Sequence, residues 1–328
     1  IISNDEPLYG DKLVQLLGAP RLYGGTIEKR HIKIAHASQK ALEKCILALV
    51  TRLHQKTGLR NLCIAGGVGL NCSANSMLHD VPFLDEIFVQ PASSDRGLPL
   101  GSALIGQREY DEKFVVPKNI FLGPTYGSDD YLDALKIAGV PYKRIENPSA
   151  VAARFLFDGN IIGWFQGRSE CGPRALGNRS ILADPRSADM KDQINSRVKF
   201  REEFRPFAPA VIEEEASRIF NMKYPSPYMT STFKVQAGWA DRLGAITHID
   251  GTARVQTVNP TQNKLFYNLI KEFSILSSVP VVLNTSFNAR GEPIVETPAN
   301  ALATFFSVGL DALFLGNYLV TKETTGSF

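Results

Sequence analysis

Residues 164–209 constrain this chain more than any other segment, because they combine dense charge with rigid turns. The segment contains nine Lys/Arg and six Asp/Glu residues, interleaved with glycine and proline. Glycine allows backbone to approach a ligand closely, and proline stiffens the turns. We expect these turns to display Arg174, Arg179 and Arg186 around a planar oxyanion or a phosphate, which guanidinium groups bind well. The alternative is a structural network of ion pairs.

Composition sets the broad class of protein. A chain of 328 residues is long enough for two domains, each with its own core. Hydrophobic residues at 44% and charged residues at 21% are ordinary for a globular protein. The net charge of +3 and pI near 8.6 do not indicate nucleic-acid binding, but suit anionic small molecules. No apolar run is long enough to span a bilayer. We therefore expect a cytoplasmic protein that binds neither nucleic acid nor membrane.

The four cysteines are expected to be reduced thiols. Cys45, Cys63, Cys72 and Cys171 show no CxxC spacing and lie in apolar or motif contexts. Neither a disulfide framework nor a zinc site fits this pattern.

The first part of the chain is predicted to be a layered α/β unit. Apolar residues at helical spacing indicate a helix over 37–57, followed by a buried strand over 61–65. A glycine turn, a short helix, a strand over 86–89 and a helix over 99–110 follow. A segment rich in proline and glycine predicts a domain boundary at about 125–148.

The second part of the chain is predicted to alternate helices and strands. The predicted helices are 129–138, 150–157, 190–198, 262–277 and 298–308, and the predicted strands are 161–165, 228–235, 253–258, 281–283 and 312–320.

Four long motifs carry a resemblance to one enzyme family. They are GRSECGPRALGNRSILADPR, VKFREEFRPFAPAV, DGTARVQTV and LNTSFNARGEPIVETP, in this order. The chain resembles the O-carbamoyltransferases of the nodulation-protein-U and cephamycin type, which include aminoglycoside, ansamycin and aminocoumarin carbamoyltransferases. The resemblance implies the C-terminal half of an actin/sugar-kinase-like domain at residues 1–125, followed by a YrdC-like α/β domain at 126–328. The chain starts at Ile1, and we expect it to be a fragment without the upstream part of the actin-like domain.

The resemblance also implies a reaction. The YrdC-like domain is expected to convert carbamoyl phosphate and ATP, with Mg²⁺, into carbamoyladenylate and pyrophosphate. The actin-like domain, with bound Fe²⁺, is expected to transfer the carbamoyl group to a hydroxyl of a small-molecule acceptor. The alternative is an adenylate-forming enzyme that modifies tRNA or a protein. The acceptor stays open, as does the formation of a homodimer.

The resemblance assigns roles to residues that match the family motifs. The residues expected to bind carbamoyl phosphate or ATP are Arg174, Lys199, Arg205 and Arg254, which are also the expected catalytic residues, with Asn284, Ser286, Gly66, Gly67 and Asn71. Arginine binds phosphate bidentately, and the amide and hydroxyl give directional hydrogen bonds.

Several assignments have a structural alternative. Asp95 is the expected metal ligand by resemblance, and a helix N-cap is its alternative role. The glycine turn at 66–71 is either a phosphate-binding turn or a simple connection between strand and helix. His248 and Asp250 are either an acid/base pair or a turn, and the turn is favoured. Phe165, Phe207 and Phe287 are expected in the core more than beside an adenine.

Overall fold

The structure is a computed structural model, which describes residues 9–22, 24–111, 117, 119–202 and 204–322. It divides into two compact units. Unit 1 consists of Ile1–Leu62 and Met77–Glu86, and unit 2 of Cys63–Ser76 and Ile87–Phe328. The predicted functional boundary between residues 1–125 and 126–328 stays a prediction. No helix in the described part of the chain is long and apolar enough to cross a membrane.

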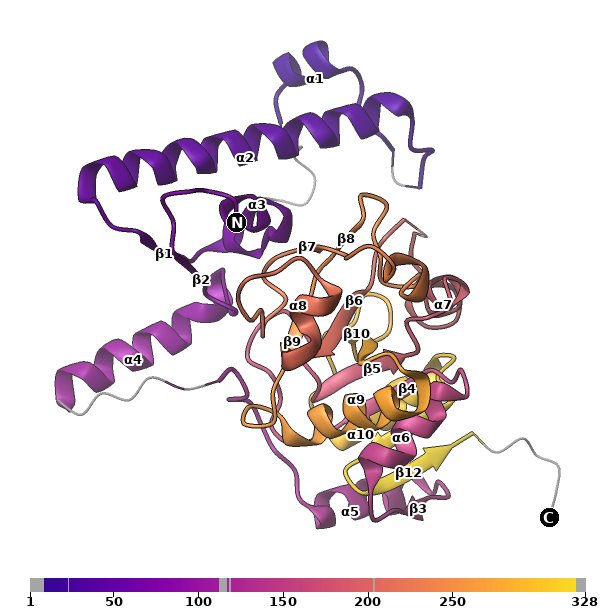
Figure 1. The fold of residues 1–328 in the computed structure, drawn as a ribbon. Coiled ribbons are helices and arrows are strands. Elements are labelled where there is room, and N and C mark those ends of the chain that lie inside the picture. Colours follow the sequence, from indigo (N-terminus) through magenta and orange to yellow (C-terminus); the bar gives the residue numbers. More distant parts are fainter. Residues whose placement is uncertain (1–8, 23, 112–116, 118, 203, 323–328) are drawn as a thin grey trace. The chain divides into compact units, whose positions relative to one another are not determined.

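Unit 1 is dominated by one long helix. Helix α1 (Asp11–Leu17) lies beside α2 (Lys29–Thr57), because the Arg30 guanidinium donates to the carbonyls of Leu17 and Ala19 (Figure 1). The prediction of a helix over 37–57 is confirmed, and the helix begins earlier. Its N-terminus is held by a capping box between Glu28 and His31, which supplies partners for free backbone amides.

Residues 61–110 follow the predicted order of elements. Its elements are β1 (Asn61–Ile64), the 3₁₀ turn η1 (Gly67–Leu70), α3 (Cys72–Leu78), β2 (Glu86–Val89), the 3₁₀ turn η2 (Asp95–Gly97) and α4 (Leu98–Tyr110). Strands β1 and β2 form a two-stranded sheet.

Unit 2 contains a mixed sheet of eight strands, in the order β3-β12-β11-β4-β5-β10-β6-β9. The strands are β3 (Lys143–Arg144), β4 (Ile162–Phe165), β5 (Arg179–Ala183), β6 (Ala208–Ile212), β9 (Gln256–Val258), β10 (Val281–Ser286), β11 (Ala312–Leu315) and β12 (Tyr318–Thr321). A two-stranded sheet of β7 (Phe233–Lys234) and β8 (Thr252–Ala253) is separate. The α/β class is confirmed, whereas the likeness to actin and sugar kinases stays a prediction.

Helices cover this sheet and close its core (Figure 1). Helix α6 packs against α9, α9 contacts β6 and β10, and α10 packs on α5, β4 and β11. The helices of unit 2 from residue 128 onward are α5 (Ser128–Ala138), α6 (Pro148–Phe157), α7 (Asp189–Ile194), the π-helix η3 (Asn195–Lys199), the 3₁₀ turns η4 (Glu213–Glu215) and η5 (Ala240–Arg242), α8 (Ala216–Ile219), α9 (Lys264–Ser277) and α10 (Pro298–Ser307). The core includes Trp164, Phe266 and Phe273, all fully buried.

Two strand predictions were wrong. The segment predicted as one strand over 228–235 forms only the two-residue strand β7. The segment 312–320 forms two antiparallel strands, β11 and β12, because Gly316 with φ +58° reverses the chain between them. Strands β5 and β6 were not predicted at all, and both are completely buried.

Candidate anion-binding site

The ends of four neighbouring strands meet at one edge of the large sheet. Strand β10 is antiparallel to β5 and to β6, and β6 is parallel to β9. The carboxyl end of β10 therefore lies at the same edge as the amino ends of β5, β6 and β9. The loops that precede those three strands carry Arg174, Arg205 and Arg254. Sheet topology thus explains why residues far apart in the sequence come together.

These loops enclose a cavity of about 220 Å³. Its lining residues are Cys72, Arg174, Arg201, Arg205, Pro206, Phe207, His248 and Arg254. The structure therefore brings together three of the predicted arginines and adds a fourth, Arg201. Among the described residues, the lining contains four guanidinium groups and no carboxylate, and we call it the anion cavity.

A carboxylate fixes the turn that carries Arg174. One carboxylate oxygen of Glu170, Oε1, accepts hydrogen bonds from the backbone amides of Leu176 at 2.6 Å and of Asn178 at 2.9 Å. Burial raises the pKa of Glu170, and these amides oppose that shift. Gly177 closes the turn at φ +102°, where an added Cβ would lie 2.2 Å from the Phe266 ring. The turn therefore requires glycine at this position.

Asn284 and Gln256 attach the same turn to the edge of the sheet. The Gln256 amide donates to the carbonyl of Leu176 at 2.9 Å, and the Asn284 amide donates to Gln256 Oε1 at 2.8 Å and to the carbonyl of Ala175 at 3.3 Å. Asn284 is 1% exposed, and its Oδ1 has no hydrogen-bond partner among the described residues. Asn284, predicted to bind the ligand, is seen here to position the residues next to Arg174.

The arginines of the cavity repel one another. Burial and the neighbouring charge of Arg254 lower the pKa of Arg174 to about 10, and burial and Arg205 lower that of Arg201 to about 10. Burial also lowers the pKa of Arg254, with Arg201 adding to the shift and the Cys72 thiol opposing it. All of them remain protonated at neutral pH. The cavity is therefore a concentrated positive charge, which an anion would neutralise.

Lys199 lies at the end of the π-helix η3, a type of helix that occurs frequently at functional sites. It is 6% exposed, and its ammonium donates to the carbonyl of Ser286 at 2.6 Å, to Asn288 Oδ1 at 2.7 Å and to the carbonyl of Asn288 at 3.0 Å. Burial and the charge of Arg201 lower its pKa to about 7. Lys199 and Ser286, both predicted to bind carbamoyl phosphate or ATP, thus contact each other, although neither lines the anion cavity.

His248 and Asp250 lie in one turn, and the hydroxyl of Thr252 contacts both of their side chains. The Thr252 hydroxyl donates to Asp250 Oδ1 at 2.7 Å and lies 3.2 Å from His248 Nδ1. Burial lowers the pKa of His248, and the Asp250 charge and a contact with the Phe207 backbone oppose this shift. The structural alternative describes Asp250 well, whereas His248 faces the anion cavity.

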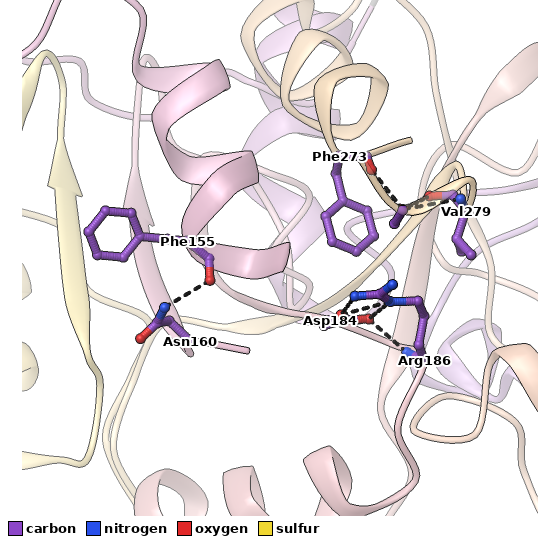
Figure 2. Close-up of polar contacts among 7 residues, drawn as sticks. Phe155, Asn160, Asp184, Arg186, Phe273 and Val279 are labelled. Carbon is purple, nitrogen blue, oxygen red and sulfur yellow. Dashed lines mark hydrogen bonds and ion pairs between the residues drawn. The ribbon is translucent and has the colours of Figure 1, made fainter. Parts of the chain in front are cut away.

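Two of the arginines in the 164–209 segment do not display their charge to a ligand, contrary to prediction. Arg179 is fully buried over the Phe165 ring, and its guanidinium donates to backbone carbonyls, with Gln166 at 2.7 Å. Arg186 pairs with Asp184 at 2.6 Å, and Figure 2 shows the two side chains facing each other. Arg186 therefore follows the alternative of a structural ion pair, whereas Arg179 is held by backbone carbonyls instead.

The predicted residues of the glycine turn and the metal site lie outside the lining of the anion cavity. Gly66 has φ +87° and leads into η1 with Gly67, and Asn71 Oδ1 accepts from the amide of Ala74. Asp95 begins η2 and is exposed. In the described part of the chain, no group of three His, Cys, Asp or Glu side chains could hold a metal ion. The described residues alone therefore do not complete an iron site, and the role of Asp95 as an iron ligand stays a prediction.

Sequence reasoning missed Arg201 and Cys72 as cavity residues. Arg201 lies in the same motif as Arg205, and its guanidinium stacks 4.5 Å from the centre of the Phe207 ring. The spacing of two arginines around one phenylalanine was a signal that could have indicated it. Cys72 follows the glycine turn, and no local pattern connects it with residues beyond 170. Phe207 was predicted as core, and it is both buried and part of the cavity wall.

Comparison with known families identifies the chain. The family model for the carbamoyltransferase C-terminus matches residues 153–322, and the model for the carbamoyltransferase N-terminus matches residues 3–104. The chain belongs to the carbamoyltransferase family. The match to the C-terminal model includes Arg174, Arg205 and Arg254, and so most of the anion cavity.

Curated members of the carbamoyltransferase family are similar over most of the chain. Nodulation protein NolNO of Sinorhizobium fredii is 41% identical over 93% of this chain and 46% of its own length. NolO of Bradyrhizobium diazoefficiens is 41% identical over 92% of this chain and 57% of its own length. Nodulation protein U of Rhizobium tropici is 35% identical over 84% of this chain and 46% of its own length. The chain thus spans about half the length of these relatives.

Solved structures show a more distant likeness. The similarity to a structure of full-length HypF extends over 56% of this chain and 23% of the HypF chain, with a TM-score of 0.37 and 16% sequence identity. Sua5 of P. abyssi covers 53% of this chain and 48% of its own, with a TM-score of 0.37 and 14% identity. Scores at this level carry no argument about function.

Proposed function

We propose that this chain is part of an ATP-dependent O-carbamoyltransferase, and that the anion cavity binds the phosphate of carbamoyl phosphate. The observation that carries the proposal is the lining of four guanidinium groups without a carboxylate. Membership of the carbamoyltransferase family supports the reaction class.

The size of the cavity supports a small anion rather than a whole nucleotide. Pockets for drug-sized ligands measure roughly 300–1,000 Å³, and the anion cavity measures about 220 Å³. A larger groove of about 560 Å³ between α5 and α10 is mostly apolar, and none of its lining residues lines the anion cavity. A phosphate with a carbamoyl group suits the smaller, charged cavity.

The proposed chemistry has two steps that balance. Water attacks carbamoyl phosphate at carbon or at phosphorus: a new bond to the water oxygen forms, the bond from that atom to the bridging oxygen breaks, and carbamate, phosphate and a proton are released. A carbamate oxygen then attacks the α-phosphorus of ATP, and pyrophosphate leaves as carbamoyladenylate forms. Negative charge concentrates on phosphate oxygens in both steps, so fixed cations supply most of the stabilisation.

Within this proposal, each part of the site has a role that its geometry supports. Arg174 and Arg254 neutralise the phosphate, because burial strengthens charge interactions. Arg205, which is 54% exposed and lies 3.9 Å from Glu202, guides the anion inward. Lys199 keeps the chain around Ser286 in place and adds charge when protonated.

The proposal includes a hydroxyl-bearing small molecule as the final acceptor. The described residues alone do not complete an iron site, so the proposed steps use the cations of the anion cavity. Nor does the anion cavity provide a carboxylate ligand for Mg²⁺, so Mg²⁺ would enter with ATP.

Exchange of labelled pyrophosphate into ATP tests the activation step. We expect the 328-residue chain to catalyse exchange that depends on carbamoyl phosphate. Arg174→Ala should abolish it. Arg186→Ala is the matched control, because Arg186 lies in the same segment but pairs with Asp184 outside the cavity, and it should retain exchange.

Two results would contradict the proposal. Exchange that depends on bicarbonate and threonine would move the chain to the enzymes that modify tRNA. Equal exchange by the Arg174→Ala and wild-type proteins would show that the anion cavity is not the reaction site.

A further inference from the structure

One wall of the anion cavity comes from a distant part of the sequence. Cys72 is the first residue of α3, whereas every other residue of the lining lies beyond residue 170. All four cysteines are free, and Cys45 and Cys63 are exposed. Cys72 therefore differs from those two thiols in lying against a cluster of cations.

Hydrogen bonds within unit 2 fix the position of Cys72. The Asn75 amide donates to the carbonyls of Gly69 at 2.9 Å and of Thr230 at 2.7 Å. The Ser76 hydroxyl lies 2.8 Å from the Thr232 hydroxyl and accepts from the Thr232 amide at 2.6 Å. Asn75 is 2% exposed, so this anchor is protected from water. The start of α3 is thus attached to the segment before β7, and Cys72 faces the cavity.

The surroundings of the thiol favour negative charge. Cys72 lies close enough to Arg254 and Arg174 to act on the pKa of both guanidiniums. Arg254 Nε and His248 Nε2 are buried and have no well-formed hydrogen bond among the described residues. The guanidiniums attract an anionic reagent into the cavity and so bring it to the thiol beside them. Nucleophile and anion-binding groups therefore share one cavity.

We propose that Cys72 is an anion-directed reactive thiol, which anionic electrophiles modify in preference to neutral ones and whose modification closes the anion cavity. The inference rests on the proposed function only in that both use the same cavity. With iodoacetate the step balances. The thiolate sulfur attacks the methylene carbon, a sulfur–carbon bond forms, the carbon–iodine bond breaks, iodide leaves, and the thiol proton goes to the buffer. The attached carboxylate then occupies the place of a phosphate beside Arg174 and Arg254.

Alkylation rates at single cysteines test the inference. The 328-residue protein is treated with iodoacetate or with iodoacetamide at low salt, and mass spectrometry of peptides gives the rate at each cysteine. We expect the iodoacetate-to-iodoacetamide ratio at Cys72 to exceed that at exposed Cys63 by at least about 10-fold, the lower end of electrostatic attraction in charged clefts. Saturating inorganic phosphate should slow alkylation at Cys72 and leave Cys63 unchanged. Equal ratios at the two thiols would overturn the proposal.

Binding of inorganic phosphate, measured by calorimetry, separates this inference from the proposed function. Wild-type protein should lose phosphate binding after carboxymethylation with iodoacetate. The Cys72→Ser protein should bind phosphate with the same affinity before and after that treatment. Untreated wild-type protein that binds no phosphate would contradict the proposed function. If phosphate binds but does not slow the alkylation of Cys72, and if modification of Cys72 does not weaken phosphate binding, the inference is wrong while the proposed function stands.

Discussion

The long helix of unit 1 and the large sheet of unit 2 are built in opposite ways. Helix α2 has 29 residues, and Val50 is the one residue described as buried in it. Leu49, Leu53 and Ile32 are all more than half exposed. Strands β4, β5 and β6, by contrast, are buried along their entire length.

This difference separates local from long-range stabilisation. The capping box at Glu28 and the left-handed Gly58 at its end define α2 within its own sequence. The sheet depends on residues that are far apart, because β4 pairs with β11 and β6 pairs with β9. The loops of the anion cavity are attached to the strands of the sheet, so we expect the cavity to be lost when the sheet unfolds.

The largest expected effect is a contrast in stability between the two regions. Phe273→Ala should lower the free energy of unfolding of unit 2 by about 3–5 kcal/mol, because it leaves a void under α9 in a fully packed core. The measurement is urea unfolding followed by tryptophan fluorescence, since Trp164 lies in the same core.

Leu49→Ala is the matched control in α2. Leu49 is 67% exposed, so its removal should change the free energy of unfolding by less than about 0.5 kcal/mol. Similar losses for the two variants would show that α2 is as tightly packed as the sheet.

The next effect distinguishes buried from exposed cations of the cavity. Arg174→Ala or Arg254→Ala should weaken carbamoyl phosphate binding by roughly 2–5 kcal/mol, because a desolvated phosphate loses a charged partner. Arg174→Lys should recover only part of this, since an ammonium does not form a bidentate fork. Arg205→Ala should cost about 1 kcal/mol or less, because Arg205 is 54% exposed and screened by water.

Melting temperature measured on the same variants separates binding from folding. Among the described residues, no ion pair holds Arg174 in its turn, and the nearby carboxylate of Glu170 accepts from backbone amides. Unchanged carbamoyl phosphate affinity in a folded Arg174→Ala protein would place the site elsewhere.

A further effect is a pH dependence from Lys199. Its folded pKa of about 7 lies below the 10.5 of an unfolded lysine. Below pH 7 both states hold the proton, and the burial of charge destabilises the fold fully. Between pH 7 and 10.5 the unfolded state binds more protons, so stability rises with pH by at most about 1.4 kcal/mol per unit. Relative to the Lys199→Met protein, the wild-type protein should therefore become more stable from pH 7 to pH 9. The unfolding free energy of wild type minus that of the variant is the quantity that rises.

Asn288→Ala supplies the control for this titration. It removes the Oδ1 acceptor 2.7 Å from the ammonium, so the rise should begin at a lower pH. A difference that stays flat from pH 7 to pH 9 would mean that the oxygen acceptors keep Lys199 charged throughout.

Local patterns in the sequence predicted the elements that depend on local interactions. The helices at 37–57, 99–110 and 129–138 follow from apolar spacing and glycine stops, and the structure contains each of them. The arginines of the anion cavity came from the family resemblance. Their convergence could not be predicted from spacing, because it requires the strand order at the edge of the sheet.

Strands β5 and β6 were missed for a physical reason. They are short and buried on both faces, and they lie in motifs whose arginines and prolines suggest turns. Arg179 shows the same difficulty in one side chain. A motif arginine is read as a ligand-binding group, yet the Arg179 guanidinium donates to backbone carbonyls inside the fold. Sequence cannot distinguish the two uses until the partner carbonyls are placed in space.

Four guanidiniums without a carboxylate also make the fold sensitive to its solvent. Any multivalent anion that enters the cavity binds the native state and not the unfolded chain, so it raises stability by mass action. If the proposed function is correct, phosphate or sulfate in a purification buffer should act on the protein as a ligand does. Dialysis into an anion-poor buffer removes that contribution and leaves the mutual repulsion of the arginines uncompensated. The stability of the native state should therefore be quoted together with the anion in the buffer.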